Sequence, residues 1–155
     1  MRSAQKALQA TRLGRTQIGL FAHKDYIAAF GMPATLAELE QHHLIGFDRD
    51  DHSFRSVGKL AASLTRDSFA FRCDSDIGQL AALRAGLGIG GCQAAVARAS
   101  PDLLPVLPKA VRFSLDVWLA MHEDLKATRR IRLVFDHVSH ALAAFLAGDR
   151  GIDQA

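Results

Sequence analysis

The chain has 155 residues, which is enough for one domain with a real core or for two small lobes. Hydrophobic residues make up 49% and charged residues 23%, as in ordinary globular proteins, and the formal net charge of +3 is too small to require a nucleic-acid partner. Two cysteines are too few for a disulfide framework and favour free thiols in a reducing cytoplasm. No segment has the length and apolarity of a membrane helix or a signal peptide, so we expect a cytoplasmic protein.

The first elements are predicted from short apolar runs and turn residues. Residues 1–15 are polar and basic and are expected to form a loose lead-in. The apolar run 16–22 predicts a buried strand, and residues 23–30 predict a short helix that ends before Gly-Met-Pro. Thr35 and Glu38 have the spacing of a capping box, which predicts the start of a second short helix.

The next stretch predicts strands and loops. Residues 44–47 are apolar and predict a second buried strand, whereas residues 48–58 are charged and predict a loop. Two further strands, at 59–64 and 68–72, are expected around a turn at Arg66–Asp67.

The clearest unit resembles a βαβ motif. The strand ending at Arg72 is followed by Cys73-Asp74-Ser75, where either Asp74 or Ser75 can cap the next helix. Three apolar residues of that helix are expected on its buried face, namely Ile77, Leu80 and Ala81.

A glycine-rich stretch follows this helix. Gly86 stands where a left-handed C-terminal cap belongs, residues 87–90 predict a strand, and Cys92 and Gln93 are expected to begin another helix. The glycine spacing matches neither the dinucleotide-binding motif nor a phosphate loop. A helix cap with tight strand packing is therefore the favoured interpretation.

The last third of the chain predicts strands at 103–107 and 113–121 and a long helix at 128–147. Five apolar residues repeat at helical spacing along that helix: Ile131, Phe135, Val138, Leu142 and Phe145. Strands that alternate with helices predict an α/β fold with a mainly parallel sheet.

Several phrases occur in the order and spacing of one protein family. They include IGLFAHKDYIAAFGMPATLAELEQHHLIGF, DSDIGQLAALRAGLGIG, PDLLPVLP, VWLAMHEDLKATRRIR and FDHVSHALAAFL. Together they resemble the C-terminal effector-binding domain of the LysR-type transcriptional regulators from about residue 13 to 146. Gly90-Gly91-Cys92-Gln93 departs from the commoner pattern, in which leucine and proline follow the glycines.

The resemblance implies an α/β fold like that of type II periplasmic binding proteins, with a mixed sheet in which parallel strands dominate. Two lobes of such a domain clasp a small effector. Residues 23–121 would form a largely complete lobe II, residues 1–22 and 122–147 a partial lobe I, and residues 148–155 a tail. The chain would cross between the lobes at two hinges, at Ala22–His23 and at Met121–His122. The helix-turn-helix and the opening of lobe I are expected to be missing.

The resemblance places the effector between the lobes. A helix N-terminus suits an anionic or carbonyl group, so a carboxylate effector is expected at the start of the helix after Asp74. Seven residues are expected to line that site: Phe47, Cys73, Asp74, Ser75, Gly90, Gly91 and Gln93. A plain helix cap is the alternative role for Asp74 and Ser75, and a solvated helix start is the alternative for Gln93.

Other chemistry finds little support in the sequence. The histidines at 23, 42, 43, 52 and 122 do not recur at ligand spacing with cysteines or carboxylates, so no metal or other cofactor is expected. Asp136 and His140 can pair on one helix, but no nucleophile with an oxyanion hole accompanies them. The cluster Arg129-Arg130-x-Arg132 is too small to indicate DNA binding.

Three functions remain open at this level. The first is an effector-sensing domain that binds a small organic molecule, carries out no chemistry and does not itself bind DNA. The second is an interaction module that self-associates without a ligand. The third is an enzyme on a solute-binding fold, which would need a paired general acid and base in the cleft.

Overall fold

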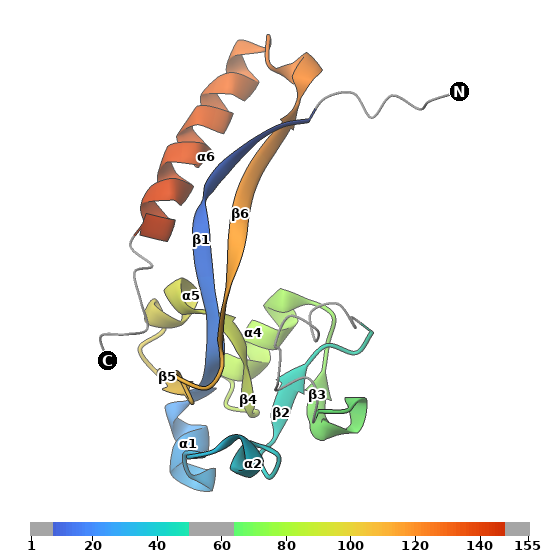
Figure 1. Ribbon diagram of the computed structural model, residues 1–155, viewed down its shortest axis with the longest axis vertical. Helices are drawn as coiled ribbons and strands as arrows, with labels where there is room; N and C mark the ends of the chain where they lie inside the picture. The colour runs from blue at the N-terminus through green and yellow to red at the C-terminus, as the bar shows by residue number, and fades with distance from the viewer. Residues whose placement is uncertain (1–7, 50–63, 148–155) are drawn as a thin grey trace.

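The computed structural model describes residues 8–49 and 64–147. Most of the expected strand at 59–64, most of the expected loop after residue 49 and His52 lie outside the described residues; Leu64, which is described, is not in a strand. A compact lobe occupies one end of the molecule, and a long arm extends from it (Figure 1). The arm consists of a two-stranded ladder with one helix alongside.

Short 3-10 helices lie at Arg66–Ser68 and at Glu123–Leu125. The remaining elements are, in chain order, β1 (Leu8–His23), α1 (Lys24–Phe30), α2 (Leu36–Leu39), β2 (Leu44–Gly46), β3 (Phe69–Arg72), α4 (Asp76–Arg84), β4 (Ile89–Gln93), α5 (Ala94–Arg98), β5 (Leu103–Val106), β6 (Arg112–His122) and α6 (Arg129–Ala147).

The described strands form one mixed sheet with the order β3-β2-β4-β1-β5, and β6 also pairs with β1. The α/β class and the mixed sheet are confirmed. The predicted dominance of parallel strands is wrong, because β2 pairs in parallel with β3 and β4 while β1 pairs antiparallel with β4, β5 and β6. The reason is the length of β1, since this one strand pairs antiparallel with three others, β4, β5 and β6.

β1 extends further than predicted. The expected loose lead-in is wrong for residues 8–15, which pair with β6 from Leu8 opposite His122 onward. Arg12 and Arg15 hydrogen-bond across the ladder to Asp116 at 2.7 and 3.0 Å. Polar residues can form strand here because the two-stranded arm leaves much of its surface in water.

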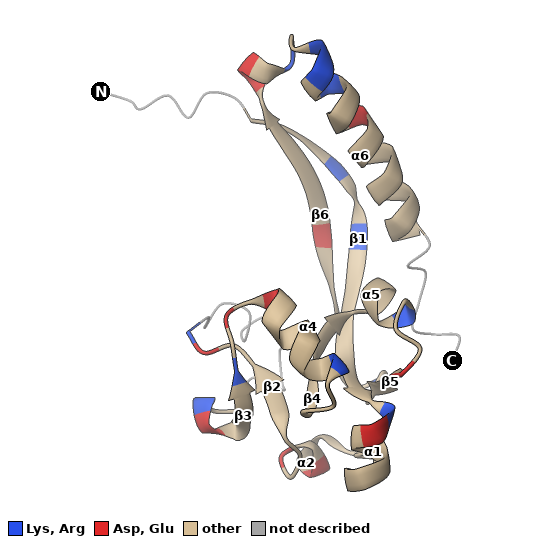
Figure 2. Cartoon of the chain, turned by 180° about the vertical axis from the view of Figure 1, so that it is seen from behind, with Lys and Arg blue, Asp and Glu red and all other residues tan. Residues whose placement is uncertain are grey.

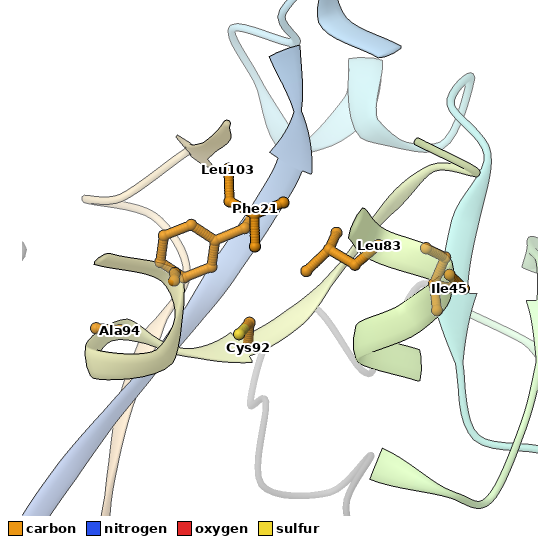
Figure 3. Packing of buried hydrophobic residues seen from close by; sticks show 8 residues of the cluster. Phe21, Ile45, Leu83, Cys92, Ala94 and Leu103 are labelled. Carbon is orange, nitrogen blue, oxygen red and sulfur yellow. The ribbon is translucent and has the colours of Figure 1, made fainter. Parts of the chain in front are cut away.

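Both faces of the lobe's sheet carry a core. On the face covered by α4 and α5, Phe21, Ile45, Leu83 and Cys92 pack together (Figure 3). On the opposite face, near α1 and α2, a second cluster is made by Ala22, Tyr26, Leu39, Leu44, Ile89, Val106 and Val111. A sheet buried on both sides suits the short apolar run of β2, which is buried along its whole length.

Local capping chemistry agrees with the predictions. The backbone N–H of Glu38 donates to the Thr35 hydroxyl at 3.2 Å, and the Glu38 carboxylate accepts from the N–H of Ala34 at 2.9 Å. Ser75 caps α4 by accepting from the N–H of Gly78 at 3.3 Å. Gly86, with φ +72°, takes the left-handed position after that helix.

The buried face of α4 differs from the prediction. Gln79, Ala82 and Leu83 are buried, and the predicted Leu80 packs half-buried against the core. Ile77, at 81%, and Ala81 are exposed, contrary to the prediction. α4 is a short helix held between the β3 turn and the cap at Gly86, so its attachment points decide which face meets the sheet. The most apolar residues of the segment do not decide it.

The final helix is confirmed and packs along β1 in the arm. Leu146 at its end is buried, and Ile131, Phe135 and Leu142 are half-buried. Leu133 and Val134 are each 62% exposed, so α6 also has apolar side chains in contact with solvent. Within the described residues, no helix is long and apolar enough to cross a membrane.

Candidate functional site

A partly open cavity of about 390 Å³ lies along β2 and β4 and reaches the edge where these two parallel strands end. Its described walls come from β2 and β4, from the start of β3 and from α2, from the first turns of α4 and α5, and from the part of the β1–β6 ladder next to the lobe. In α/β sheets, ligands bind beyond the carboxyl ends of parallel strands. The volume is within the range of small-molecule sites.

The described walls of the cavity are mostly aliphatic and aromatic. Apart from the thiol of Cys92, only Asp76, Gln79 and Gln93 contribute polar side chains. Gln79 is 7% exposed, and its Nε2 donates to the carbonyl oxygen of Cys73 at 2.7 Å. Among the described residues no hydrogen bond to Gln79 Oε1 is found, and this oxygen is not one of the buried side-chain atoms that lack a partner. The oxygen is therefore accessible and can accept a hydrogen bond from a ligand.

Cys92 brings a thiol to the same wall. The side chain is buried, and its Sγ donates to the carbonyl oxygen of Gln93 at 3.4 Å. Burial raises the pKa of the Cys92 thiol above its ordinary value, because an apolar environment disfavours the thiolate. Cys92 therefore acts here as a small apolar surface and not as a nucleophile.

Three of the predicted site residues line the cavity. They are Phe47, which follows β2, and Gly91 and Gln93, at the end of β4. Cys92 and Gln93 were expected to begin a helix, but both belong to β4, and α5 begins at Ala94. The difference arises because β4 continues to pair with β1 up to the pair formed by Gln93 and Ile18.

The other four predicted residues lie outside the cavity wall. Gly90 faces the opposite side of the strand, where an added Cβ would meet Ile45 Cβ at 3.1 Å. Cys73 lies against Gly78, whose added Cβ would meet its Sγ at 2.7 Å. Ser75 is the N-cap of α4.

Asp74 joins two segments of the chain. Its Oδ1 accepts from the backbone N–H groups of Asp48 and Arg49 at 2.8 and 2.9 Å. Asp48 in turn pairs with Arg66 at 2.6 Å, and this hydrogen bond holds the pKa of Asp48 below its ordinary value. Asp74 thus has structural partners, and an effector-binding role for Asp74 and Ser75 stays a prediction.

The two predicted hinges have the same local geometry. His23 and His122 each end a strand, and each Nδ1 accepts from the N–H two residues later, at 3.3 Å. Ala22 is fully buried, and Met121 pairs with Gln9 in the arm. Motion at these positions stays a prediction.

Gln79 and Asp76 are the site residues that the sequence reasoning missed. The available signal was helical spacing, since Gln79 lies three and four residues before the buried Ala82 and Leu83. A polar residue on that face either pairs with its neighbours or faces a ligand. Because the sequence reasoning placed Ile77 on the buried face of the helix, it did not identify Gln79 as a cavity residue.

The described residues form neither a metal-binding cluster nor a histidine oriented by a carboxylate on α6. Within residues 8–49 and 64–147, no three histidine, cysteine or acidic side chains lie close enough together to hold a metal ion. His140 contacts the backbone carbonyl of Asp136 at 2.7 Å through Nδ1, so the ring is not oriented by a carboxylate. The described cavity wall offers Asp76 as its one ionisable group besides Cys92.

A mixed sheet covered on both faces, with a cavity that reaches the ends of its parallel strands, is an architecture in which small molecules commonly bind. A comparison with protein families identifies it further. Residues 1–143 match the family described as "LysR substrate binding domain", and the chain belongs to this family. A comparison with curated proteins finds no significant match.

Solved structures share the fold. The CrgA regulatory domain of Neisseria meningitidis is 20% identical with a TM-score of 0.73, covering 92% of this chain and 72% of that one. The AmpR effector domain of Pseudomonas aeruginosa is 24% identical with a TM-score of 0.64, covering 98% and 72%. Full-length AphB of Vibrio cholerae is 20% identical with a TM-score of 0.65, covering 90% and 49%. The chain thus spans about half of that full-length regulator.

Proposed function

We propose that this chain is the effector-sensing part of a LysR-type transcriptional regulator and that it binds a small organic molecule in the cavity. The observation that supports this proposal is the cavity, which reaches the ends of β2 and β4 in a chain of the LysR substrate-binding-domain family. Its described wall lacks a paired general acid and base, so binding without chemistry is the function that its composition favours.

The lobes and hinges belong to the same proposal. Residues 23–121 would form lobe II, and residues 1–22 and 122–147 would belong to lobe I, with hinges at Ala22–His23 and Met121–His122. The end of the first crossing is anchored, because the Lys24 ammonium pairs with Asp102 at 2.7 Å and the Lys24 N–H donates to the Asp102 carbonyl at 2.8 Å. Such an anchor would hold lobe II as a rigid body while the other lobe moves.

DNA binding is not proposed for these 155 residues. The arginines at 129, 130 and 132 lie at the far end of the arm, near acidic residues of the preceding turn (Figure 2). Three exposed cations are too few for an electrostatic footprint on a duplex. A sequence-selective shift of a DNA fragment by this chain would contradict this part of the proposal.

The binding proposal is tested with a substitution that fills the cavity. Gly91 has nothing within 4 Å of an added Cβ, so Gly91→Leu should fold normally and place its side chain in the cavity. A metabolite library is screened by thermal shift, where a ligand at 100 times its Kd should stabilise the chain by about 2.7 kcal/mol. We expect hits for the native chain that Gly91→Leu abolishes. Hits that Gly91→Leu leaves intact would place binding elsewhere.

A second candidate function is self-association through the arm. The specific observation is the exposure of three large apolar side chains of the arm, Leu133, Val134 and Trp118, the last at 57%. Exposed apolar patches on soluble proteins are common at interfaces. A partner on the arm is compatible with a ligand in the lobe.

A further inference from the structure

We infer that the cavity selects an uncharged, mainly apolar molecule that carries a hydrogen-bond donor, and that it disfavours a free carboxylate. The inference rests on the proposed effector-binding function and names the class of effector. It replaces the carboxylate that the sequence suggests. Three features of the described wall carry it.

The first feature is the charge of the wall. None of the described residues around the cavity is a lysine, arginine or histidine, and the one charged group is the carboxylate of Asp76. A carboxylate ligand would lose its hydration without gaining a counter-ion, and it would face a group of the same sign. The described cations near these strand ends are Arg49, Arg66 and Arg72, which all lie within 4 Å of the Asp48 carboxylate and outside the wall.

The second feature is the state of the α4 N-terminus, where an anion would be expected to bind. Ser75 Oγ already accepts from the N–H of Gly78, and the Asp76 carboxylate stands in the first turn. An acidic residue at this position already complements the helix dipole. One N–H of the terminus thus already has an oxygen acceptor, and the helix dipole already has an acidic partner.

The third feature is the orientation of Gln79. Because its Nε2 donates to the Cys73 carbonyl, its Oε1 is the carboxamide atom left for a ligand. An oxygen acceptor in a side chain that is 7% exposed prefers a hydroxyl or N–H partner. Gln93 adds a second carboxamide at the end of β4, without a side-chain hydrogen bond to the start of α5.

Four small probes of similar size test the inference: indole, benzyl alcohol, toluene and benzoate. Binding is measured by saturation-transfer NMR and calorimetry, with Gly91→Leu to report binding inside the cavity. We expect indole and benzyl alcohol to bind more tightly than benzoate by about tenfold or more, which is the effect of one good hydrogen bond or one uncompensated charge. Gly91→Leu should abolish this binding.

The role of Gln79 is tested separately. Gln79→Met keeps the length of the side chain and removes its polar atoms, and Gln41→Met, on an exposed glutamine away from the cavity, is the matched control. We expect Gln79→Met to weaken indole about tenfold, to leave toluene unchanged and to keep the native NMR fold. Gln41→Met should change neither.

Two outcomes overturn the inference. If benzoate binds as tightly as benzyl alcohol and Gly91→Leu abolishes both, the ligand class is wrong while the effector cavity stands. If no probe shows binding that is sensitive to Gly91→Leu, the inference fails, and the metabolite screen decides the proposed function independently.

Discussion

Substituting Gly88 by alanine should destabilise the fold far more than the same change at Gly91, three residues later. A Cβ at Gly88 would lie 2.2 Å from the carbonyl oxygen of His43 and 2.9 Å from its carbonyl carbon. Both are backbone atoms, so no side-chain rotation can relieve the overlap. A Cβ at Gly91 would meet nothing within 4 Å.

The expected cost follows from what must move. Separating the start of β4 from β2 strains the packing by about 1–3 kcal/mol. It also weakens the 2.8 Å hydrogen bond from the Ile89 N–H to the His43 carbonyl, at about 1 kcal/mol. The free energy of unfolding should fall by about 2–4 kcal/mol in Gly88→Ala. For a chain of this length, Tm should fall by roughly 6–12 °C.

Urea denaturation followed by circular dichroism measures both variants against the native chain. We expect Gly91→Ala to lie within about 0.5 kcal/mol of the native value, because it adds only a small backbone-entropy effect. Equal stability of Gly88→Ala and Gly91→Ala would refute the argument. It would mean that the glycine-rich stretch does not bring β4 against His43.

Two further predictions concern the arm. Hydrogen bonds from Arg12 first and then from Arg15 hold the pKa of Asp116 below its ordinary value. This pairing stabilises the folded chain above about pH 4, and the stabilisation is lost as the pH falls through the folded-state pKa. Asp116→Asn should therefore lower Tm slightly at neutral pH and low salt, and the difference from the native chain should disappear in acid. The chain should also form dimers that light scattering detects at high concentration. Val134→Glu should shift them to monomers, whereas Ile77→Glu, at a more exposed apolar site on the lobe, should have no effect. A strict monomer in which hydrogen exchange protects residues 129–146 as well as 75–92 would show that the arm completes its own core and that the lobe assignment is wrong.

The elements that could be predicted are those decided by local chemistry. Thr35, Ser75 and Gly86 act within a few residues of themselves, through a hydroxyl at a helix start or a left-handed backbone at a helix end. The strands of the lobe were also predictable, because burial on both faces requires continuous apolar runs. Phe47 and Gly91 were expected at the site from the family resemblance, and both line the cavity, Phe47 just after β2 and Gly91 within β4.

What could not be predicted depends on partners far away in sequence. Residues 8–15 become strand only because β6, about 100 residues later, pairs with them and supplies Asp116 to Arg12. The buried face of α4 depends on how the helix lies across β1, β2 and β4, so the sequence did not reveal Gln79 as a cavity residue. Periodicity describes a helix by itself, whereas a short helix takes its orientation from the sheet.

The distribution of charge around the strand ends gives the site its character. The acidic groups Asp48 and Asp74 lie just beyond β2 and β3, and Asp74 joins the two following segments. Arg66, before β3, and Arg72, at its end, both pair with Asp48. Because these charges satisfy one another in water, their contribution to stability is small, but they keep the segment after β2 next to the start of α4. The adjoining described wall is then left with apolar side chains and amides. We expect such a site to select an effector by its shape and by the hydrogen bond that it donates to Gln79, because the described wall contains no cation that would attract an anion.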